Sequence, residues 1–214
     1  MLKVILFDFD GVVVESVDLK TQAFRELFRD YPDKLSEIEK YHLDNGGLSR
    51  YEKFKYIYTR ILKEDLTEKK FIELCQSFQR FVVDKVVEAP FVPGAQELLA
   101  YCLNRFQMYV VSGTPQDEIR EIVKRRNLDR FFLGVYGAPQ IKADLINEIL
   151  RKNSLNPKEV LFIGDSNNDY RAAQDAEILF FGRLTSERQV WQEDTCIEGS
   201  ANDMWGVIEY LKMI

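Results

Sequence analysis

Two aspartates follow directly on the first apolar run of the chain. Lys3–Phe7 is typical of a buried strand, and Asp8-Phe9-Asp10-Gly11 comes straight after it. Residues two apart in an extended segment point to the same side, so Asp8 and Asp10 are expected to lie together. At ~4 Å and an effective dielectric of ~20, two carboxylates repel by about 4 kcal/mol, so one must hold a proton or a cation must join them. A carboxylate nucleophile that forms a covalent phosphoryl intermediate, beside a carboxylic acid that protonates the leaving group, would use this pair, although a plain turn would also use Asp and Gly.

A second strand-like segment also ends in acidic residues. Val160–Ile163 runs into Gly164-Asp165-Ser166-Asn167-Asn168-Asp169, where a helix is predicted to begin. Asp165 and Asp169, completed by Asp8 and the carbonyl of Asp10, would offer oxygen ligands to a hard cation. Mg²⁺ suits such a set because it takes few carboxylates, several waters and a substrate oxygen. Asp169 also has a structural explanation, since acidic residues are favoured in the first turn of a helix.

Two further places have residues suited to holding an anion. Ser112-Gly113-Thr114-Pro115 follows the apolar segment Met108–Val111, and backbone N–H groups at the start of the next helix would be free there. Ser112 would donate to a phosphate, and Gly113 would allow its close approach. Lys142 stands at the head of a predicted helix, where a cation opposes the helix dipole, so neutralising a phosphate would explain it. An ordinary loop and a surface lysine remain the alternatives.

The elements that must position these residues follow from hydrophobic patterning. Short apolar runs alternate with amphipathic segments, which indicates βαβ units and an open parallel sheet. Ligands bind such sheets at the carboxyl ends of the strands, where the residues above lie. The predicted strands are Lys3–Phe7, Met108–Val111, Val160–Ile163, Ile178–Phe181 and, more weakly patterned, Phe131–Tyr136. The predicted helices between and after them are Pro93–Arg105, Pro115–Arg126, Ala143–Asn153, Asn168–Ala176 and Asp203–Lys212.

The segment from Ser16 to Ala89 breaks this alternation. Apolar stripes at helical spacing recur along it and no part has a convincing strand pattern, so it is predicted to consist of consecutive helices. The predicted helices are Val17–Phe28, Lys34–Tyr41, Arg50–Leu62 and Thr67–Val87. We therefore predict an α/β core formed by residues 1–15 and 90–214, and an all-helical cap formed by residues 16–89.

Bulk composition excludes several classes of protein. The 214 residues are 46% hydrophobic and carry a net charge of −6, which is ordinary for a soluble globular protein and unfavourable for binding nucleic acid. No segment reaches the ~20 apolar residues of a membrane span, and no signal peptide is apparent. Cys75, Cys102 and Cys196 are an odd, widely spaced set, which favours free thiols in a reducing cytoplasm. We expect a cytoplasmic monomer with no membrane or nucleic-acid partner.

Taken together and in order, these motifs resemble the haloacid-dehalogenase-like hydrolase superfamily. The resemblance spans nearly the whole chain, and the helical segment after the first motif resembles the phosphoglycolate phosphatase and β-phosphoglucomutase branch. It implies a Rossmann-like core and a magnesium-dependent phosphatase acting on a small phosphorylated metabolite. It also implies that Asp8 is the nucleophile and Asp10 the general acid/base. Phosphate binding would fall to Ser112, Gly113 and Lys142, and metal binding to Asp8, Asp10, Asp165 and Asp169.

Single residues argue for or against the other activities known in this superfamily. Haloacid dehalogenases need no acid two positions after the nucleophile, so Asp10 argues against them. Phosphonatases use a cap lysine, and Lys20, Lys53 and Lys55 leave that activity open. β-Phosphoglucomutases carry a histidine ten residues after the acid/base, where this chain has Lys20, so a mutase is disfavoured. The single histidine, His42, is interpreted as structural.

The cap loop Asn45-Gly46-Gly47-Leu48-Ser49-Arg50 is the predicted specificity element. Two glycines before the helix N-cap Ser49 would let the loop reach down over the core. Arg50 would then offer a planar fork to a carboxylate, hydroxyl cluster or second phosphate of the substrate. The alternative is a solvent-exposed residue at a helix start. Glu15, where relatives often have aspartate, is a departure that bears on the cap hinge.

Overall fold

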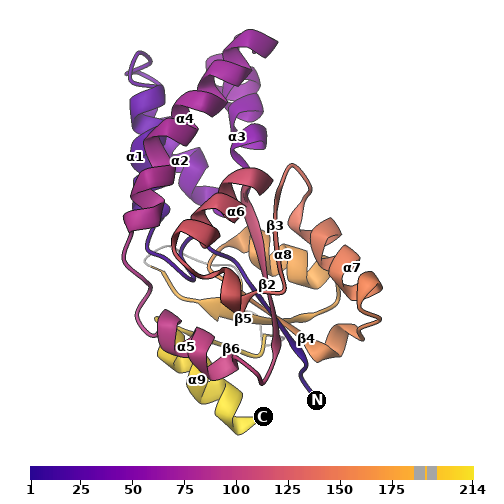
Figure 1. Ribbon diagram of the computed structural model, residues 1–214. Coiled ribbons are helices and arrows are strands. Elements are labelled where there is room, and N and C mark those ends of the chain that lie inside the picture. Colours follow the sequence, from indigo (N-terminus) through magenta and orange to yellow (C-terminus); the bar gives the residue numbers. More distant parts are fainter. Residues whose placement is uncertain (186–190, 192–196) are drawn as a thin grey trace.

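A six-stranded parallel sheet forms the centre of the molecule (Figure 1). The structure is a computed structural model that describes residues 1–185, 191 and 197–214. The strand order is β3-β2-β1-β4-β5-β6, so the first strand lies in the middle of the sheet. The bounds are β1 Val4–Phe7, β2 Gln107–Pro115, β3 Gly134–Ala138, β4 Val160–Gly164, β5 Leu179–Arg183 and β6 Gly199–Ala201. The predicted α/β class is confirmed.

Helices cover both faces of this sheet (Figure 1). Side chains alternate along β1, so that Ile5 and Phe7 belong to one buried cluster and Val4 and Leu6 to the other. The first cluster includes residues of α5, α6 and α9, and the second includes residues of α7 and α8. Their bounds are α5 Ala95–Cys102, α6 Gln116–Arg125, α7 Lys142–Lys152, α8 Asn167–Asp175 and α9 Met204–Met213; two short 3₁₀ turns are Asp129–Phe131 and Pro157–Glu159.

The helical segment after β1 stands above the carboxyl end of the sheet (Figure 1). It consists of α1 Val17–Leu27, α2 Leu35–Asp44, α3 Arg50–Tyr56, the π-helical turn Ile57–Leu62 and α4 Glu68–Glu88. Phe24 of α1, Phe54 of α3 and Phe78 of α4 pack their rings together at its centre, with centroids 5.2–6.1 Å apart. α1–α4 bury their apolar stripes against each other, and the cluster that they form is continuous with the one on the Phe7 face of the sheet. We call this helical segment the cap, and its bounds as a domain stay a prediction.

Three details differ from the predicted elements. β2 continues through Ser112 to Pro115, with an irregularity in its pairing to β3 after Val111, so the serine motif lies on a strand end and not in a loop. The helix predicted over Arg50–Leu62 ends in a π-helical turn. β6 was not predicted, because Gly199-Ser200-Ala201 has no apolar pattern.

Two predictions about bulk properties have structural counterparts. No helix among the described residues is long and apolar enough to cross a membrane. Cys75 is half-buried and Cys102 is buried, and both are free thiols. Cys196 lies outside the described residues.

Candidate active site

Three neighbouring strands end at one place, and each is followed by predicted site residues. β1 pairs in parallel with β2 on one side and with β4 on the other, with Phe7 level with Val110 and Ile163. The backbone N–H of Asp8 donates to the carbonyl of Ile163 at 2.9 Å, which extends the sheet by one bond. The acidic residues of the first and last motifs therefore meet although more than 150 positions separate them.

Asp8, Lys142 and Asp169 form a buried charged triad. The Lys142 Nζ lies 3.0 Å from Asp8 Oδ1 and 2.5 Å from Asp169 Oδ1. Burial alone would lower the pKa of Lys142, but the carboxylates of Asp169 and Asp8 outweigh it and raise that pKa. Lys142 is therefore a permanent cation beside the predicted nucleophile, and these two partners explain a lysine at the start of α7.

The second oxygen of Asp169 is held by the start of α8. Ser166 is the N-cap, and its hydroxyl accepts from the Asp169 N–H, while Asp169 Oδ2 accepts from the backbone N–H of Ser166 at 3.0 Å and from its hydroxyl at 2.6 Å. This reciprocal capping box fixes the carboxylate. Both explanations of Asp169 offered by the sequence are thus compatible, since one side chain starts the helix and reaches Lys142.

Asp165 completes a cluster of three carboxylates with Asp8 and Asp169. One carboxylate oxygen from each lies within 4.8 Å of the others. Burial, with the nearby carboxylates, raises the pKa of Asp165 well above its usual range, and burial raises the pKa of Asp8 to about 7 against the pull of Lys142. A Cβ on Gly11 would lie 2.0 Å from Asp165 Oδ2, and Gly11 has a φ of 78°, so only glycine fits beside this cluster.

Asp10 points away from that cluster into a different set of partners. Its carboxylate accepts from Ser16 Oγ at 2.6 Å, from Lys20 Nζ at 2.5 Å and from Thr114 Oγ1 at 3.0 Å. Burial acts to raise the pKa of Asp10, but Lys20 and the hydroxyl donors outweigh it, and the net effect is a lowered pKa. Asp8 and Asp10 thus occupy environments that push their pKa values apart, that of Asp8 upward and that of Asp10 downward, so Asp10 is ionised and Asp8 is the carboxyl that holds a proton more readily.

The serine motif lies beside this pair. Ser112 is buried, and its hydroxyl accepts from the Thr114 N–H at 3.1 Å, while Thr114 Oγ1 is within 2.8 Å of Lys20 Nζ. A Cβ on Gly113 would lie 2.3 Å from the carbonyl oxygen of Gly47 in the cap loop. The glycine is therefore required by the approach of the cap, which is a constraint that the sequence alone did not reveal.

The predicted cap loop does reach the core. Asn168 of α8 donates its side-chain amide to the carbonyl of Gly46 at 2.6 Å. A Cβ on Gly47 would fall 2.4 Å from Ser166 Oγ and 3.4 Å from Lys142 Nζ, and Gly47 has a φ of 74°. Both glycines therefore allow the loop to close directly over the charged triad, as the sequence predicted.

Arg50, predicted to meet the substrate, is engaged by the core. Its guanidinium is 5% exposed and pairs through both terminal nitrogens with the carboxylate of Glu118 on α6, and it lies 4.4 Å from the centre of the Phe78 ring. Burial raises the pKa of Glu118 despite this pair. The ion pair joins cap to core, and buried pairs of this kind gain little net stability. A substrate contact by Arg50 stays a prediction.

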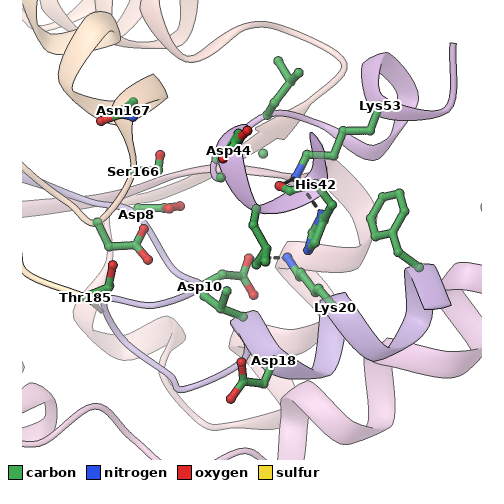
Figure 2. A pocket seen from close by; sticks show the side chains of 18 of the residues that line it. Asp8, Asp10, Asp18, Lys20, His42, Asp44, Lys53, Ser166, Asn167 and Thr185 are labelled. Carbon is green, nitrogen blue, oxygen red and sulfur yellow. Dashed lines mark hydrogen bonds and ion pairs between the residues drawn. The ribbon is translucent and has the colours of Figure 1, made fainter. Parts of the chain in front are cut away.

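A cavity of about 1200 Å³ lies between the cap and the carboxyl ends of the strands. Figure 2 shows that Asp8 and Ser166 face it from the core, while Lys20, His42 and Lys53 face it from the cap. Gly113, Asp165 and Arg50 also line it, whereas Ser112, Lys142 and Asp169 are buried behind these residues. The predicted site residues are thus brought together at one cavity, either lining it or lying directly behind its lining.

Ser16 and Arg183 were not singled out by the sequence, and Lys20 was considered only in weighing other activities of the superfamily. Ser16 and Lys20 are four positions apart at the start of α1, and this helical spacing, which places both on one face, was the signal that could have linked them. Arg183 donates to the carbonyl of Gly11 at 2.7 Å and to the carboxylate of Glu15, so it braces the turn after the nucleophile. The glutamate that departs from the family pattern thus has an ion-pair partner.

The order of motifs, the sheet and the acidic cluster invite comparison with known proteins. The model of the family described as "Haloacid dehalogenase-like hydrolase" matches residues 5–182. The chain belongs to this family. The prediction from the sequence is therefore confirmed, and so is the prediction that the chain is an enzyme of the phosphatase type.

Relatives of this hydrolase agree with that assignment. It is 28% identical over 194 residues to a phosphoglycolate phosphatase of Vibrio parahaemolyticus, covering 85% of this chain and 83% of that one. It is 22% identical over 183 residues to a phosphorylated carbohydrates phosphatase of Thermotoga maritima, covering 83% and 82%. Among solved structures, a β-phosphoglucomutase of Clostridium difficile aligns with a TM-score of 0.81 at 17% identity over 100% and 96% of the two chains. The structural likeness supports the fold.

Proposed function

We propose that this hydrolase is a magnesium-dependent phosphohydrolase that cleaves a small phosphomonoester through a phosphoryl group carried on Asp8. The observation that carries the proposal is the buried triad of Asp8, Lys142 and Asp169, of which Asp8 faces the cavity between cap and core. A carboxylate held beside a permanent cation, with a second carboxylate directed elsewhere, supports nucleophilic attack on an anionic phosphate.

The three-aspartate cluster fits a divalent cation. Burial and mutual repulsion raise the pKa values of Asp8 and Asp165, so the ionised cluster is held at a free-energy cost that a cation would remove. The donors are all carboxylate oxygens, which is the chemistry that Mg²⁺ prefers. Asp8, Asp165 and Asp169 would hold it, with the Asp10 backbone carbonyl as the further ligand predicted from the sequence. Bound Mg²⁺ would neutralise charge on the phosphate oxygens and on Asp8.

Residues of this chain supply the nucleophile, the groups that hold the phosphoryl group, and the acid/base. Asp8 attacks the phosphorus while the phosphoryl group, in a loose transition state, is held by Lys142 and the backbone and hydroxyl of the Ser112-Gly113 segment. Asp10 exchanges protons with the leaving oxygen and then with the water that cleaves the phosphoryl group from Asp8. Because its pKa is lowered, Asp10 must take up a proton before it can act as the acid, and an anionic phosphate beside it would raise its pKa toward that state. The cap loop at Gly46 and Gly47 lies over this centre and excludes bulk water.

The substrate is proposed to be a compact organic phosphate. The cap forms one wall of the cavity and its loop lies over the charged triad, which favours a compact molecule over the surface of a large phosphoprotein. Among the relatives, those from Vibrio and Thermotoga are named for phosphoglycolate and for phosphorylated carbohydrates. A phosphomutase or phosphonatase with the same machinery is the alternative.

Phosphate release from a panel of small phosphomonoesters, with Mg²⁺ and with EDTA, tests the proposal. We expect inorganic phosphate from at least one ester in Mg²⁺ and none above background in EDTA. Absence of release from every ester, in a protein shown to be folded, would favour mutase or phosphonatase chemistry. Equal release in EDTA would contradict the metal requirement.

Metal binding should stabilise the protein more as the pH rises. Without a cation, the raised pKa values of Asp8 and Asp165 make the folded state bind more protons than the unfolded chain, so its stability falls as the pH rises from about 4 through about 7. Mg²⁺ binds the ionised cluster and reverses this loss. A thermal melt should show a shift of roughly 5 °C or more in saturating Mg²⁺ at pH 8, and little shift at pH 5.

Two variants separate this effect from general ion binding. Asp165→Asn should remove the shift at pH 8, whereas Asp175→Asn, which removes an exposed charge from the end of α8, should keep it. A shift of equal size at pH 5 and pH 8, or one that persists in Asp165→Asn, would place the metal elsewhere.

A further inference from the structure

The cap loop ends in a buried ion pair with the core. Arg50 is the first residue of α3, directly after the loop, and Glu118 lies in the first turn of α6. Their side chains are 4% and 9% exposed, and both terminal nitrogens of Arg50 donate to the carboxylate oxygens of Glu118. A buried pair contributes little net stability and no step of the proposed reaction uses this one, so its presence here needs another explanation.

Arg50 is bound to Glu118 in a way that a substrate contact would disrupt. Its Nη1 also lies 3.5 Å from the carbonyl oxygen of Cys75, and the face of its guanidinium packs on the ring of Phe78. Burial raises the pKa of Glu118 against the pull of Arg50, so the carboxylate depends on this partner to stay ionised. Turning Arg50 toward an anionic substrate would leave a buried carboxylate without its cation, which is strongly unfavourable.

The pair lies within the contact between α6 of the core and α4 of the cap (Figure 1). Apolar side chains of both helices belong to one buried cluster, among them Phe78 and Val82 of α4 and Ile119 and Ile122 of α6. Apolar attraction is non-directional, whereas a bidentate guanidinium–carboxylate pair fixes both distance and orientation. The pair therefore adds a geometric constraint to a contact that is otherwise apolar at this point.

Arg126 binds the cap at the other end of the same contact. It follows α6 directly, and its Nη1 donates at 2.6–2.9 Å to three carbonyls at the end of α4, those of Val86, Val87 and Ala89. These carbonyls come just before Pro90, where the chain leaves the cap. From Glu118 to Arg126 the chain advances about 12 Å at ~1.5 Å per residue. The Arg50–Glu118 pair thus holds the cap on the side away from this linker.

The loop that Arg50 terminates lies over the charged triad. Ser49 is the N-cap of α3, and its hydroxyl accepts from the Glu52 N–H, so the loop and the start of the helix are one unit. Gly47, three positions before Arg50, approaches Ser166 and Gly113 of the core so closely that neither glycine has room for a Cβ. A displacement of Arg50 would therefore also displace the part of the cap that covers the reacting groups.

We propose that Glu118 is a positioning residue that binds Arg50 and thereby holds the cap loop over the charged triad before substrate arrives. Arg50 then acts through Glu118 and does not touch the substrate. The effect of the pair on turnover rests on the proposed phosphohydrolase function, whereas its effect on the loop does not.

Hydrogen exchange in the substrate-free protein tests the docking of the loop. In Glu118→Gln, the backbone amides of residues 45–49 should exchange about tenfold faster than in the wild type, because the loop can open without breaking an ion pair. Glu121→Gln removes an exposed carboxylate one turn further along α6 and should leave their exchange unchanged. The central strand β4 should exchange equally in all three proteins, which separates loop opening from a general loss of stability. Equal exchange of residues 45–49 in the wild type and Glu118→Gln would overturn the proposal.

Kinetics distinguish positioning from substrate contact. With the ester that the panel shows to be turned over fastest, Glu118→Gln and Arg50→Met should each lower kcat/KM by about tenfold or more. The double variant should lie within about threefold of the single variants, because all three lose the same interaction. If Arg50 bound the substrate, Glu118→Gln would free it, and kcat/KM would stay at or above the wild-type value; that result would overturn the assignment. Absence of turnover in the wild type would count against the phosphohydrolase, and the exchange measurement would still decide whether Glu118 holds the loop.

Arg50→Lys keeps the proposal testable if Glu118→Gln does not fold. A lysine retains the charge opposite Glu118 but lacks the planar fork that binds both carboxylate oxygens. The amides of residues 45–49 should then exchange about threefold faster or more, with β4 unchanged. Wild-type exchange of these residues in Arg50→Lys would contradict a role for the bidentate pair in holding the loop.

Discussion

Replacing Asp8 with asparagine should lower phosphate release by roughly 10³-fold or more, because the amide keeps the shape of the side chain but is no nucleophile. The Asp8 carboxylate receives the backbone N–H of Phe9 at 2.7 Å and the ammonium of Lys142 at 3.0 Å, so its position is fixed before substrate arrives. Initial rates of phosphate release in Mg²⁺, with the ester that the panel shows to be turned over fastest, measure this loss.

The same substitution should leave the fold intact. In the absence of metal, burial raises the pKa of Asp8 to about 7, so its ionised form weakens the folded state above that pH. Asp8→Asn removes this penalty, and its melting temperature in EDTA at pH 8 should equal or exceed that of the wild type. Asp18→Asn, at an exposed position on the rim of the same cavity, is the matched control and should retain normal rates. Activity of Asp8→Asn within tenfold of the wild type would remove Asp8 from the reaction.

Replacing Lys142 with methionine should impair both rate and stability. The side chain holds Asp8 and Asp169 together, and its loss leaves two buried carboxylates facing each other. Removing one member of a buried ion pair costs about 3–5 kcal/mol. We expect the free energy of unfolding, measured in EDTA at pH 8, to fall by about this amount in Lys142→Met. The loss should be smaller at pH 5, because the remaining carboxylates can then take up protons.

The rate should fall by roughly 10²- to 10³-fold, the effect of removing one charge that stabilises the transferring group. Lys142 also lowers the pKa of Asp8, so the acidic limb of the pH–rate profile should move to higher pH in Lys142→Met. Lys152→Met, at an exposed position on the same helix, should change neither the rate nor the profile. If Lys142→Met keeps the wild-type rate with an unmoved profile, Lys142 is only a structural cation.

Local sequence patterns were enough to predict most of the core architecture. The apolar run before Asp8 and the run before Asp165 are each short and bounded by glycine and acidic residues, and they form the neighbouring strands β1 and β4. Since parallel strands align their carboxyl ends, the meeting of Asp8, Asp165 and Asp169 followed from the pattern alone. β6 has three residues and no apolar alternation, so nothing local marked it.

Contacts between cap and core could not be predicted from local sequence patterns. Arg50 was expected to face a substrate because a cation is unfavourable at a helix start, and the structure gives it Glu118, 68 positions away, as a partner. Lys20 was considered as the residue that replaces a histidine and as a candidate phosphonatase lysine, whereas it bonds both Asp10 and Thr114. Such pairs depend on how the cap docks on the core, which periodicity within one segment does not encode. The pairing of Lys53 with His42 was missed for the same reason, since it joins two cap helices.

The central claim is that Asp8 carries the phosphoryl group during turnover, and trapping that group tests it most directly. The enzyme is mixed with substrate and Mg²⁺, quenched in acid within milliseconds, digested and examined by mass spectrometry. We predict a phosphate on the peptide that contains Asp8, absent from EDTA samples and from Asp8→Asn, and decaying at the rate at which free phosphate appears. Turnover with no labelled protein at any quench time, or a phosphate carried on another residue, would contradict the mechanism proposed for this chain.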